Sequence, residues 1–168
     1  MINILSPLKI GFIIGVSLVV AIGPFLSAWG GYDEGMAAYE KKDYEAALKE
    51  WEPLAEQENS VDAQYMLGKM YLRGEGVLKD YAEAAKWIRK AAEYGDPDAQ
   101  SDLGKLYMVG RGLTRVLVWV HMWFDLAAIN GKTSAIQSRN HVRRFMAKSH
   151  IKKAQRLARE WLEKHKQK

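Results

Sequence analysis

Apolar residues recur along most of this chain at helical spacing, and one such pattern occurs twice in succession. Within residues 62–97 they fall three and four positions apart, which is typical of one buried helix face. Residues 98–133 repeat the same order without a gap. The identical positions are Asp62/Asp98, Ala63/Ala99, Gln64/Gln100, Leu67/Leu103, Gly68/Gly104, Lys69/Lys105, Tyr71/Tyr107, Gly74/Gly110, Gly76/Gly112, Trp87/Trp123, Ala91/Ala127, Ala92/Ala128 and Gly95/Gly131. This period indicates a solenoid, in which each unit needs its neighbours to bury its apolar face.

Each repeat predicts two helices joined by a glycine turn. In the first repeat the turn falls at residues 74–76, and Asp80 then begins the second helix as an N-cap, with Glu83 in capping-box position. Gly68 lies inside the first helix, where glycine costs about 1 kcal/mol of helix propensity relative to alanine. Because the second repeat keeps it as Gly104, we expect a close contact between helices at this position.

The segments on both sides of the repeats predict further helices. Residues 31–61 read as a weaker half-unit and residues 134–168 as capping helices. A helix over Val116–Ile129 is apolar on nearly all sides, so the downstream helices must cover it. The helices expected in the flanking segments are Tyr32–Lys41, Tyr44–Gln57, Ser134–Lys148 and His150–Lys166, with Ser149 as the cap of the last. The expected fold is all-α: an α/α solenoid of antiparallel helix pairs with a C-terminal capping helix.

The first 30 residues differ from the rest of the chain. Lys9 precedes an uncharged stretch, Ile10–Gly30, with an apolar centre and the small residues of Ala28-Trp29-Gly30 at its end. This order is typical of a signal peptide cleaved before Gly31, which would make the protein periplasmic or secreted. The alternative is an uncleaved anchor in the inner membrane, since about 20 apolar residues can span a bilayer. Pro24 weakens a continuous spanning helix.

Charge is divided unevenly along the chain, although the net charge is only +5. Residues 31–100 hold nine Lys and Arg against sixteen Asp and Glu, whereas residues 101–168 hold fifteen against four. Residues 136–168 alone hold eleven against two, which favours a second hypothesis: docking of the C-terminal helices on an anionic membrane or polyanion. The alternative is that these charges only solvate the capping helices. Nucleic acid is not an expected partner of an exported protein.

Residues with catalytic or ligand-binding chemistry form no known motif. The chain has no cysteine, and its four histidines lack the spacing of metal ligands. His121 and Asp125 are four residues apart and can share a helix face, which favours a structural hydrogen-bond pair over a catalytic dyad. We therefore predict no catalytic residue, no metal site and no cofactor.

Several segments resemble the Sel1-like repeat family, which is related to tetratricopeptide repeats. They are AQYMLGKMYLRGEGVLKDYAEAAKWIRKAAEYGD, AQSDLGKLYMVGRG and HMWFDLAAINGKTSA. The resemblance implies a right-handed superhelix that binds other proteins, often as an adaptor in envelope or signalling assemblies. One departure concerns residues 114–117, which replace the Lys-Asp-Tyr-Ala turn, so the helix that follows loses its aspartate cap.

The resemblance also implies where a partner would bind, because the first helices of tetratricopeptide-like pairs line the concave surface. Positions kept in both repeats are needed for stacking, whereas positions that differ between the repeats are free to serve a ligand. The candidate contacts are Tyr65, Lys69, Arg73, Ser101, Lys105 and Met108. Aromatic and arginine side chains often dominate the energy of protein interfaces, although ordinary solvent exposure is the alternative for each residue. The expected function is a non-enzymatic adaptor in the periplasm or cell envelope that binds a protein or peptide.

Overall fold

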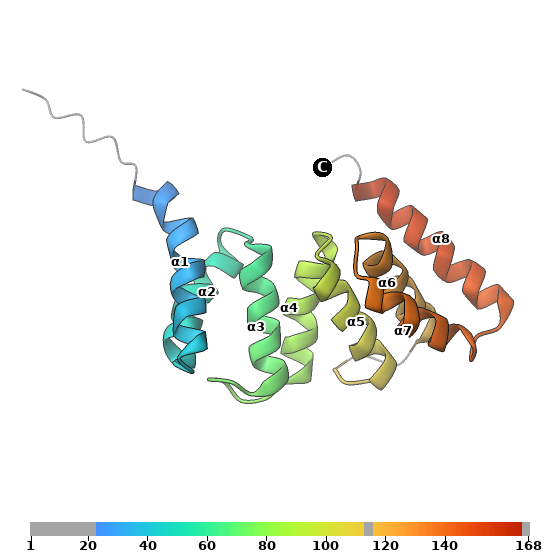
Figure 1. Cartoon of the computed structure of the whole chain (residues 1–168), viewed down its shortest axis with the longest axis horizontal. Helices are drawn as coiled ribbons and strands as arrows, with labels where there is room; N and C mark the ends of the chain where they lie inside the picture. Colours follow the sequence, from blue (N-terminus) through green and yellow to red (C-terminus); the bar gives the residue numbers. More distant parts are fainter. Residues whose placement is uncertain (1–22, 113–115, 166–168) are drawn as a thin grey trace, which may run out of the picture.

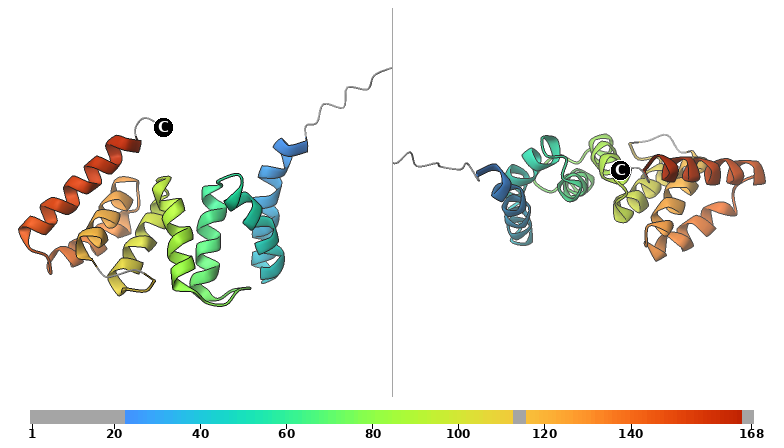
Figure 2. Two further views of the ribbon diagram at one scale, coloured as in Figure 1. Left: turned by 180° about the vertical axis from the view of Figure 1, so that it is seen from behind. Right: turned by 90° about the horizontal axis from the view of Figure 1, so that it is seen from above.

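The computed structural model describes residues 23–112 and 116–165. Within these residues the chain forms eight helices and no strand. The helices are α1 (Gly23–Glu40), α2 (Tyr44–Glu56), α3 (Val61–Arg73), α4 (Tyr81–Glu93), α5 (Pro97–Val109), α6 (Leu117–Ile129), α7 (Thr133–Arg143) and α8 (Lys148–His165). They follow one another along an elongated molecule with α1 and α8 at opposite ends (Figures 1 and 2). The predicted all-α solenoid is confirmed.

The predicted signal or anchor segment, residues 1–30, lies mostly outside the described part of the chain. Its last residues belong to α1, which begins at Gly23 and not near Tyr32 as predicted. Within residues 23–112 and 116–165, none of the helices combines the length and the hydrophobicity that crossing a bilayer requires.

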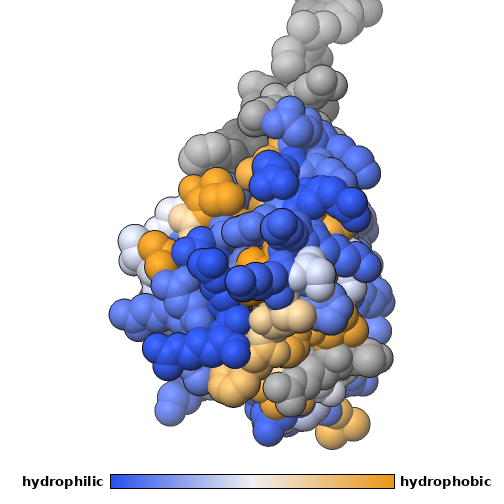
Figure 3. Space-filling view, turned by 90° about the vertical axis from the view of Figure 1, so that its right-hand side faces the viewer, coloured by the Kyte–Doolittle hydropathy of each residue, from blue (hydrophilic) through white to orange (hydrophobic). Residues whose placement is uncertain are grey.

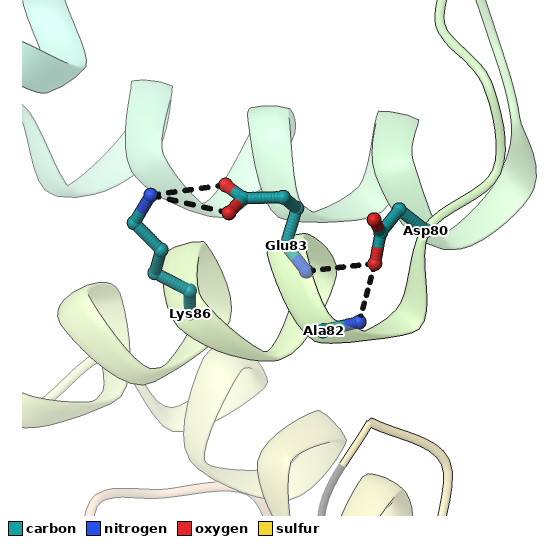
Figure 4. A network of polar contacts seen from close by, with 4 residues as sticks. All are labelled: Asp80, Ala82, Glu83 and Lys86. Carbon is teal, nitrogen blue, oxygen red and sulfur yellow. Dashed lines mark hydrogen bonds and ion pairs between the residues drawn. The ribbon is translucent and has the colours of Figure 1, made fainter.

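The start of α4 has the side-chain cap that the sequence predicts. Asp80 Oδ1 accepts hydrogen bonds from the backbone N–H groups of Ala82 (2.7 Å) and Glu83 (3.1 Å), as Figure 4 shows. The second half of the predicted capping box is not formed, because the Glu83 carboxylate binds Lys86 at 3.1 Å. The backbone N–H of Asp80 donates instead to the carbonyl of Tyr71 at 3.0 Å. Asp80 therefore connects the start of α4 to the end of α3.

The starts of α2, α3 and α5 follow the same rule, whereas those of α6 and α7 have no side-chain cap. Asp43 caps α2 and Asp96 caps α5, each by accepting a hydrogen bond from the N–H three residues later. Ser60 caps α3 in the same way. α6 has Val116 at this position and no side-chain cap, as expected from the departure in its turn. The start of α6 therefore depends on packing instead of capping.

α6 is buried on several sides, as its apolar sequence predicts. Val120, Phe124 and Leu126 are fully buried. α6 packs against α5, α7 and α8, and Ala154 and Ala158 of α8 belong to the same hydrophobic core. The prediction that downstream helices cover α6 is confirmed.

The boundary between the last two helices differs from the prediction. α7 ends at Arg143 and α8 begins at Lys148, so Ser149 lies inside α8 and does not cap it. The sequence pattern hides the turn, because Val142 and Met146 are four residues apart and both pack in the core. Apolar spacing therefore continues through a segment that is not helical throughout.

Gly68 allows α4 to approach α3 closely. A Cβ atom added at Gly68 would lie 2.5 Å from Cγ1 of Ile88 and 3.0 Å from the Ile88 backbone nitrogen. Gly104 has the same role in the second repeat, where an added Cβ would lie 2.9 Å from the ring of Phe124. The close contact expected from the repeated glycine is confirmed.

A buried glutamine joins each repeat to the helix pair before it. Gln64 and Gln100 are both 0% exposed, and the Nε2 group of each donates to a backbone carbonyl at 3.1 Å. The acceptors are Ala55 and Ala92, in the last turns of α2 and α4, where helices leave carbonyl groups without intrahelical partners. The repeated glutamine therefore stabilises the junction between successive units.

Substitution of Gly68 tests the close contact. Gly68→Ala is expected to lower the free energy of unfolding by about 1–3 kcal/mol, because the added Cβ overpacks the contact with α4. Helix propensity alone predicts the opposite, a gain of about 1 kcal/mol. Urea unfolding followed by circular dichroism distinguishes the two.

Gly31→Ala provides the matched control, because a Cβ at Gly31 would lie at ordinary contact distances of 3.5 Å from Glu50 and Leu54. This variant should be as stable as the unchanged protein or slightly more stable. If Gly68→Ala behaved like Gly31→Ala, the contact at Gly68 would not limit the approach of the helices.

Candidate functional site

Most of the candidate contacts lie on one surface, which we call the first-helix face. It is the side of α3 and α5, the first helices of the two repeats, that carries Tyr65, Lys69, Arg73, Lys105 and Met108. Lys105 and Arg73 are exposed, and the other three are partly buried. The structure therefore places five of the six candidate contacts where a partner can reach them.

Ser101 is the exception, because its side chain is only 3% exposed. The prediction that Ser101 contacts a partner is wrong. Tyr65, its counterpart in the first repeat, extends to the surface and binds Asp102 of the next repeat. A serine is too short to extend past its neighbours at this position.

Tyr65 connects the two repeats. Its hydroxyl donates to Oδ2 of Asp102 at 2.9 Å, and Lys105 binds Oδ1 of the same carboxylate at 2.7 Å. The Lys69 ammonium lies 5.2 Å from the centre of the Tyr65 ring, within range of a cation–π interaction. Burial and the charge of Asp102 raise the pKa of Tyr65, so the hydroxyl remains a donor.

Arg73 connects α3 to the N-terminal half-unit. Its guanidinium donates to the hydroxyl of Tyr39 in α1 at 2.8 Å, and Tyr39 donates to Glu75 at 2.6 Å. The Arg73 guanidinium also lies 3.7 Å from the Glu75 carboxylate. Tyr65 and Arg73 thus both contribute to contacts between successive first helices.

Met108 lies at a hollow that extends the first-helix face onto α7. The hollow has a volume of about 550 Å³. Its lining residues are Met108, Gln137, Ser138, Asn140, His141 and Arg144. They offer amide, hydroxyl and guanidinium donors and no carboxylate. The sequence does not identify the α7 residues as candidate contacts, because α7 follows the second repeat and has no equivalent helix in the first repeat with which its positions can be compared.

A second hollow of about 550 Å³ lies between α4, α6 and α8. Trp119, Trp123 and Trp161 contribute to its lining, and Trp119 is 38% exposed. Within the described residues, the indole N–H groups of Trp123 and Trp161 are buried and have no acceptor. The hollow forms where α8 crosses the second helices, so the repeat pattern alone does not reveal it.

His121 and Asp125 do not form the pair expected from their spacing. His121 is 1% exposed, and its Nδ1 has no hydrogen-bond partner among the described residues. Asp125 binds Arg139 of α7 instead, with 2.7 Å between the guanidinium and Oδ1. Burial lowers the pKa of His121, and the charge of Asp125 only partly opposes this. The imidazole is therefore held in its neutral form in the core.

Comparison with known proteins agrees with the helical repeats. The Sel1 repeat family model matches residues 61–96, 97–118 and 148–164. The chain belongs to the Sel1-like repeat family. Two of the matches correspond to the repeats found in the sequence, and the third falls on α8, the predicted cap. Sel1 repeat proteins generally mediate protein–protein interactions.

Two solved structures of this family are similar to the chain. One is c5321, described as a protective antigen present in uropathogenic Escherichia coli strains displaying an SLR fold; it is 30% identical over 82% of this chain, with a TM-score of 0.77. The other is a Sel1 repeat protein from Oxalobacter formigenes, 30% identical over 66% of this chain, with a TM-score of 0.61. The matches span 30% and 45% of those two proteins. A comparison with curated proteins gave no match.

The contact between Tyr65 and Asp102 can be tested with a double-mutant cycle. Tyr65→Phe and Asp102→Ala are each expected to lower the free energy of unfolding, with a coupling energy of about 1–3 kcal/mol, since the hydroxyl binds a charged acceptor. Urea unfolding of both single variants and the double variant gives the coupling. A coupling near zero would mean that Tyr65 does not join the repeats.

The buried state of His121 predicts a pH-dependent stability. Because burial lowers the pKa of His121, the unfolded protein takes up a proton at this residue at a higher pH than the folded protein does. The unchanged protein should therefore lose stability relative to His121→Gln as pH falls below about 6.5. Above this range the difference in unfolding free energy should be constant. Urea unfolding from about pH 5 to 7.5 measures it. His150→Gln removes an exposed histidine as a control, and a flat difference for His121→Gln would contradict the prediction.

Proposed function

We propose that this protein is a non-enzymatic adaptor that binds a protein or peptide on the first-helix face, in the periplasm or cell envelope. The observation that carries the proposal is the hollow between α5 and α7, which continues this face and is rich in hydrogen-bond donors. Membership of the Sel1-like repeat family supports the general role in protein binding.

The chemistry of the hollow suits a peptide segment. Its volume lies in the range typical of ligand sites, and it can hold a few residues. Gln137, Asn140 and Arg144 can donate to the carbonyl groups or carboxylates of such a segment, and Met108 offers an adaptable apolar contact. Lys69, which makes no ion pair with any described residue, adds positive charge to the same face. A partner with an extended, acidic segment fits this surface best.

The proposed location rests on residues 1–30, whose order is that of an export segment. Retention of these residues would tether the adaptor to the inner membrane, whereas cleavage would release it.

Photo-crosslinking in living cells tests the binding surface. A photoreactive residue placed at Lys69 or at Met108 is expected to capture the same protein, because both positions lie on the first-helix face. The same residue at Glu52, exposed on α2, should not capture it. Mass spectrometry identifies the captured protein, and equal capture from all three positions would contradict the proposal.

A charge reversal measures how much the first-helix face contributes to binding. Lys69→Glu should reduce capture through Met108 at least about fivefold, because like charges across an interface repel. Lys49→Glu makes the same change on α2 and should leave capture unchanged. If the two reversals had equal effects, net charge and not the first-helix face would govern binding.

A further inference from the structure

The turn between α7 and α8 combines an exposed aromatic ring with a cluster of positive charge. We call residues 143–153 the basic tip. Phe145, in the turn itself, is 66% exposed. The exposed basic residues of the tip are Arg143, Arg144, Lys148, Lys152 and Lys153. The tip lies at the end of the molecule opposite α1 (Figure 1).

The charge of the basic tip is not compensated within the chain. No acidic residue occurs from Leu126 to Arg159. Among the described residues, no carboxylate pairs with the five basic residues of the tip, whereas Lys132 and Arg139 nearby both have acidic partners. Lys148 also begins α8, where the helix dipole disfavours a cation. Arg143 is favoured by its place in the last turn of α7, but none of the five cations has a carboxylate partner among the described residues, so an anionic partner would stabilise the cluster.

We propose that the basic tip docks on an anionic lipid bilayer, with the Phe145 ring among the headgroups and the surrounding cations against lipid phosphates. Phenylalanine, like tryptophan and leucine, is typical of the apolar side of protein segments that insert at the boundary between headgroups and acyl chains. Lysine and arginine near an anionic surface each add to binding, and their long side chains reach phosphates at different depths. The complementarity of charge between the tip and such a surface is what selects this partner.

The packing of α8 leaves only part of the C-terminal helices free for this contact. The apolar side of α8 is used inside the protein: Ala154 and Ala158 are buried, and Leu157, Trp161 and Leu162 pack against the core. α8 therefore has no free apolar face to lay on a membrane. Figure 3 shows the end of the molecule around α7 and α8, where most of the surface is hydrophilic. Docking through the tip requires no rearrangement of this packing.

A bilayer fits the tip better than a strand of nucleic acid. Single-stranded nucleic acid binds in grooves in which several aromatic rings stack with successive bases. The basic tip offers one exposed ring, Phe145, in a short turn between two helices. A single ring surrounded by cations is suited to shallow insertion into a surface.

Vesicle sedimentation tests the proposal with the purified full chain. Phosphatidylcholine vesicles with about 30% phosphatidylglycerol should bind the protein at least tenfold more tightly than pure phosphatidylcholine vesicles, and about 0.5 M salt should remove most of this difference. Pure phosphatidylcholine also measures any charge-independent association through residues 1–30. Equal binding to both kinds of vesicle would overturn the proposal.

Two variants of equal charge locate the contact. Arg143→Gln with Lys148→Gln should weaken binding to the anionic vesicles about 20- to 30-fold. Lys41→Gln with Lys49→Gln removes the same charge at the other end of the molecule and should change binding less than about threefold. Equal losses from the two pairs would show that net charge alone drives association and would overturn the proposal.

Phe145→Ser tests insertion of the ring and should weaken binding to the anionic vesicles about tenfold, with unchanged circular dichroism. An unchanged affinity would overturn the role of the ring. A thymidine oligonucleotide provides the competing partner: if it bound the tip more tightly than the anionic vesicles and Phe145→Ser left both affinities unchanged, the partner would be nucleic acid.

Discussion

The close approach of α3 to α4 at Gly68, and of α5 to α6 at Gly104, is the constraint on which the rest of the structure depends. At both sites a single added carbon would meet the neighbouring helix at 2.9 Å or less. Close packing within a pair fixes where its second helix ends. The last turn of α4, for example, lies where Gln100 of the next repeat can donate to the Ala92 carbonyl. Packing within a pair therefore sets the junction between pairs, and the solenoid follows from repeating both contacts.

The same geometry explains why the first-helix face has two roles. First helices of successive units contact each other through long polar side chains, such as Tyr65 with Asp102 and Arg73 with Tyr39. These bonds hold part of the surface in one conformation before any partner arrives, which lowers the entropy cost of binding. Recognition is then left to side chains with fewer internal bonds and to the hollow beside Met108.

The repeats make much of this fold predictable from the sequence, because a residue that is identical in both units is often one that the packing of the helices requires. Gly68 is the clearest case. The prediction for Ser101 fails because it assumes that a position which varies between the repeats is exposed. A small buried residue can also vary without disturbing the stacking of the repeats. The hollow on α7 and the turn before α8 lie beyond the second repeat, where no internal comparison exists. Spacing alone predicts a pair of His121 with Asp125, but the Asp125 carboxylate binds Arg139 of α7, a contact between helices that spacing does not reveal.

The proposed partner site and the proposed membrane site meet at Arg144. This residue lines the hollow next to Met108 and also belongs to the basic tip. A bilayer against the tip would therefore place its phosphates beside the end of the first-helix face. An acidic segment in the hollow and an anionic lipid would then compete for one guanidinium, so each would weaken the binding of the other. The coupling requires no conformational change, because both sites use the same side chain in the turn between α7 and α8.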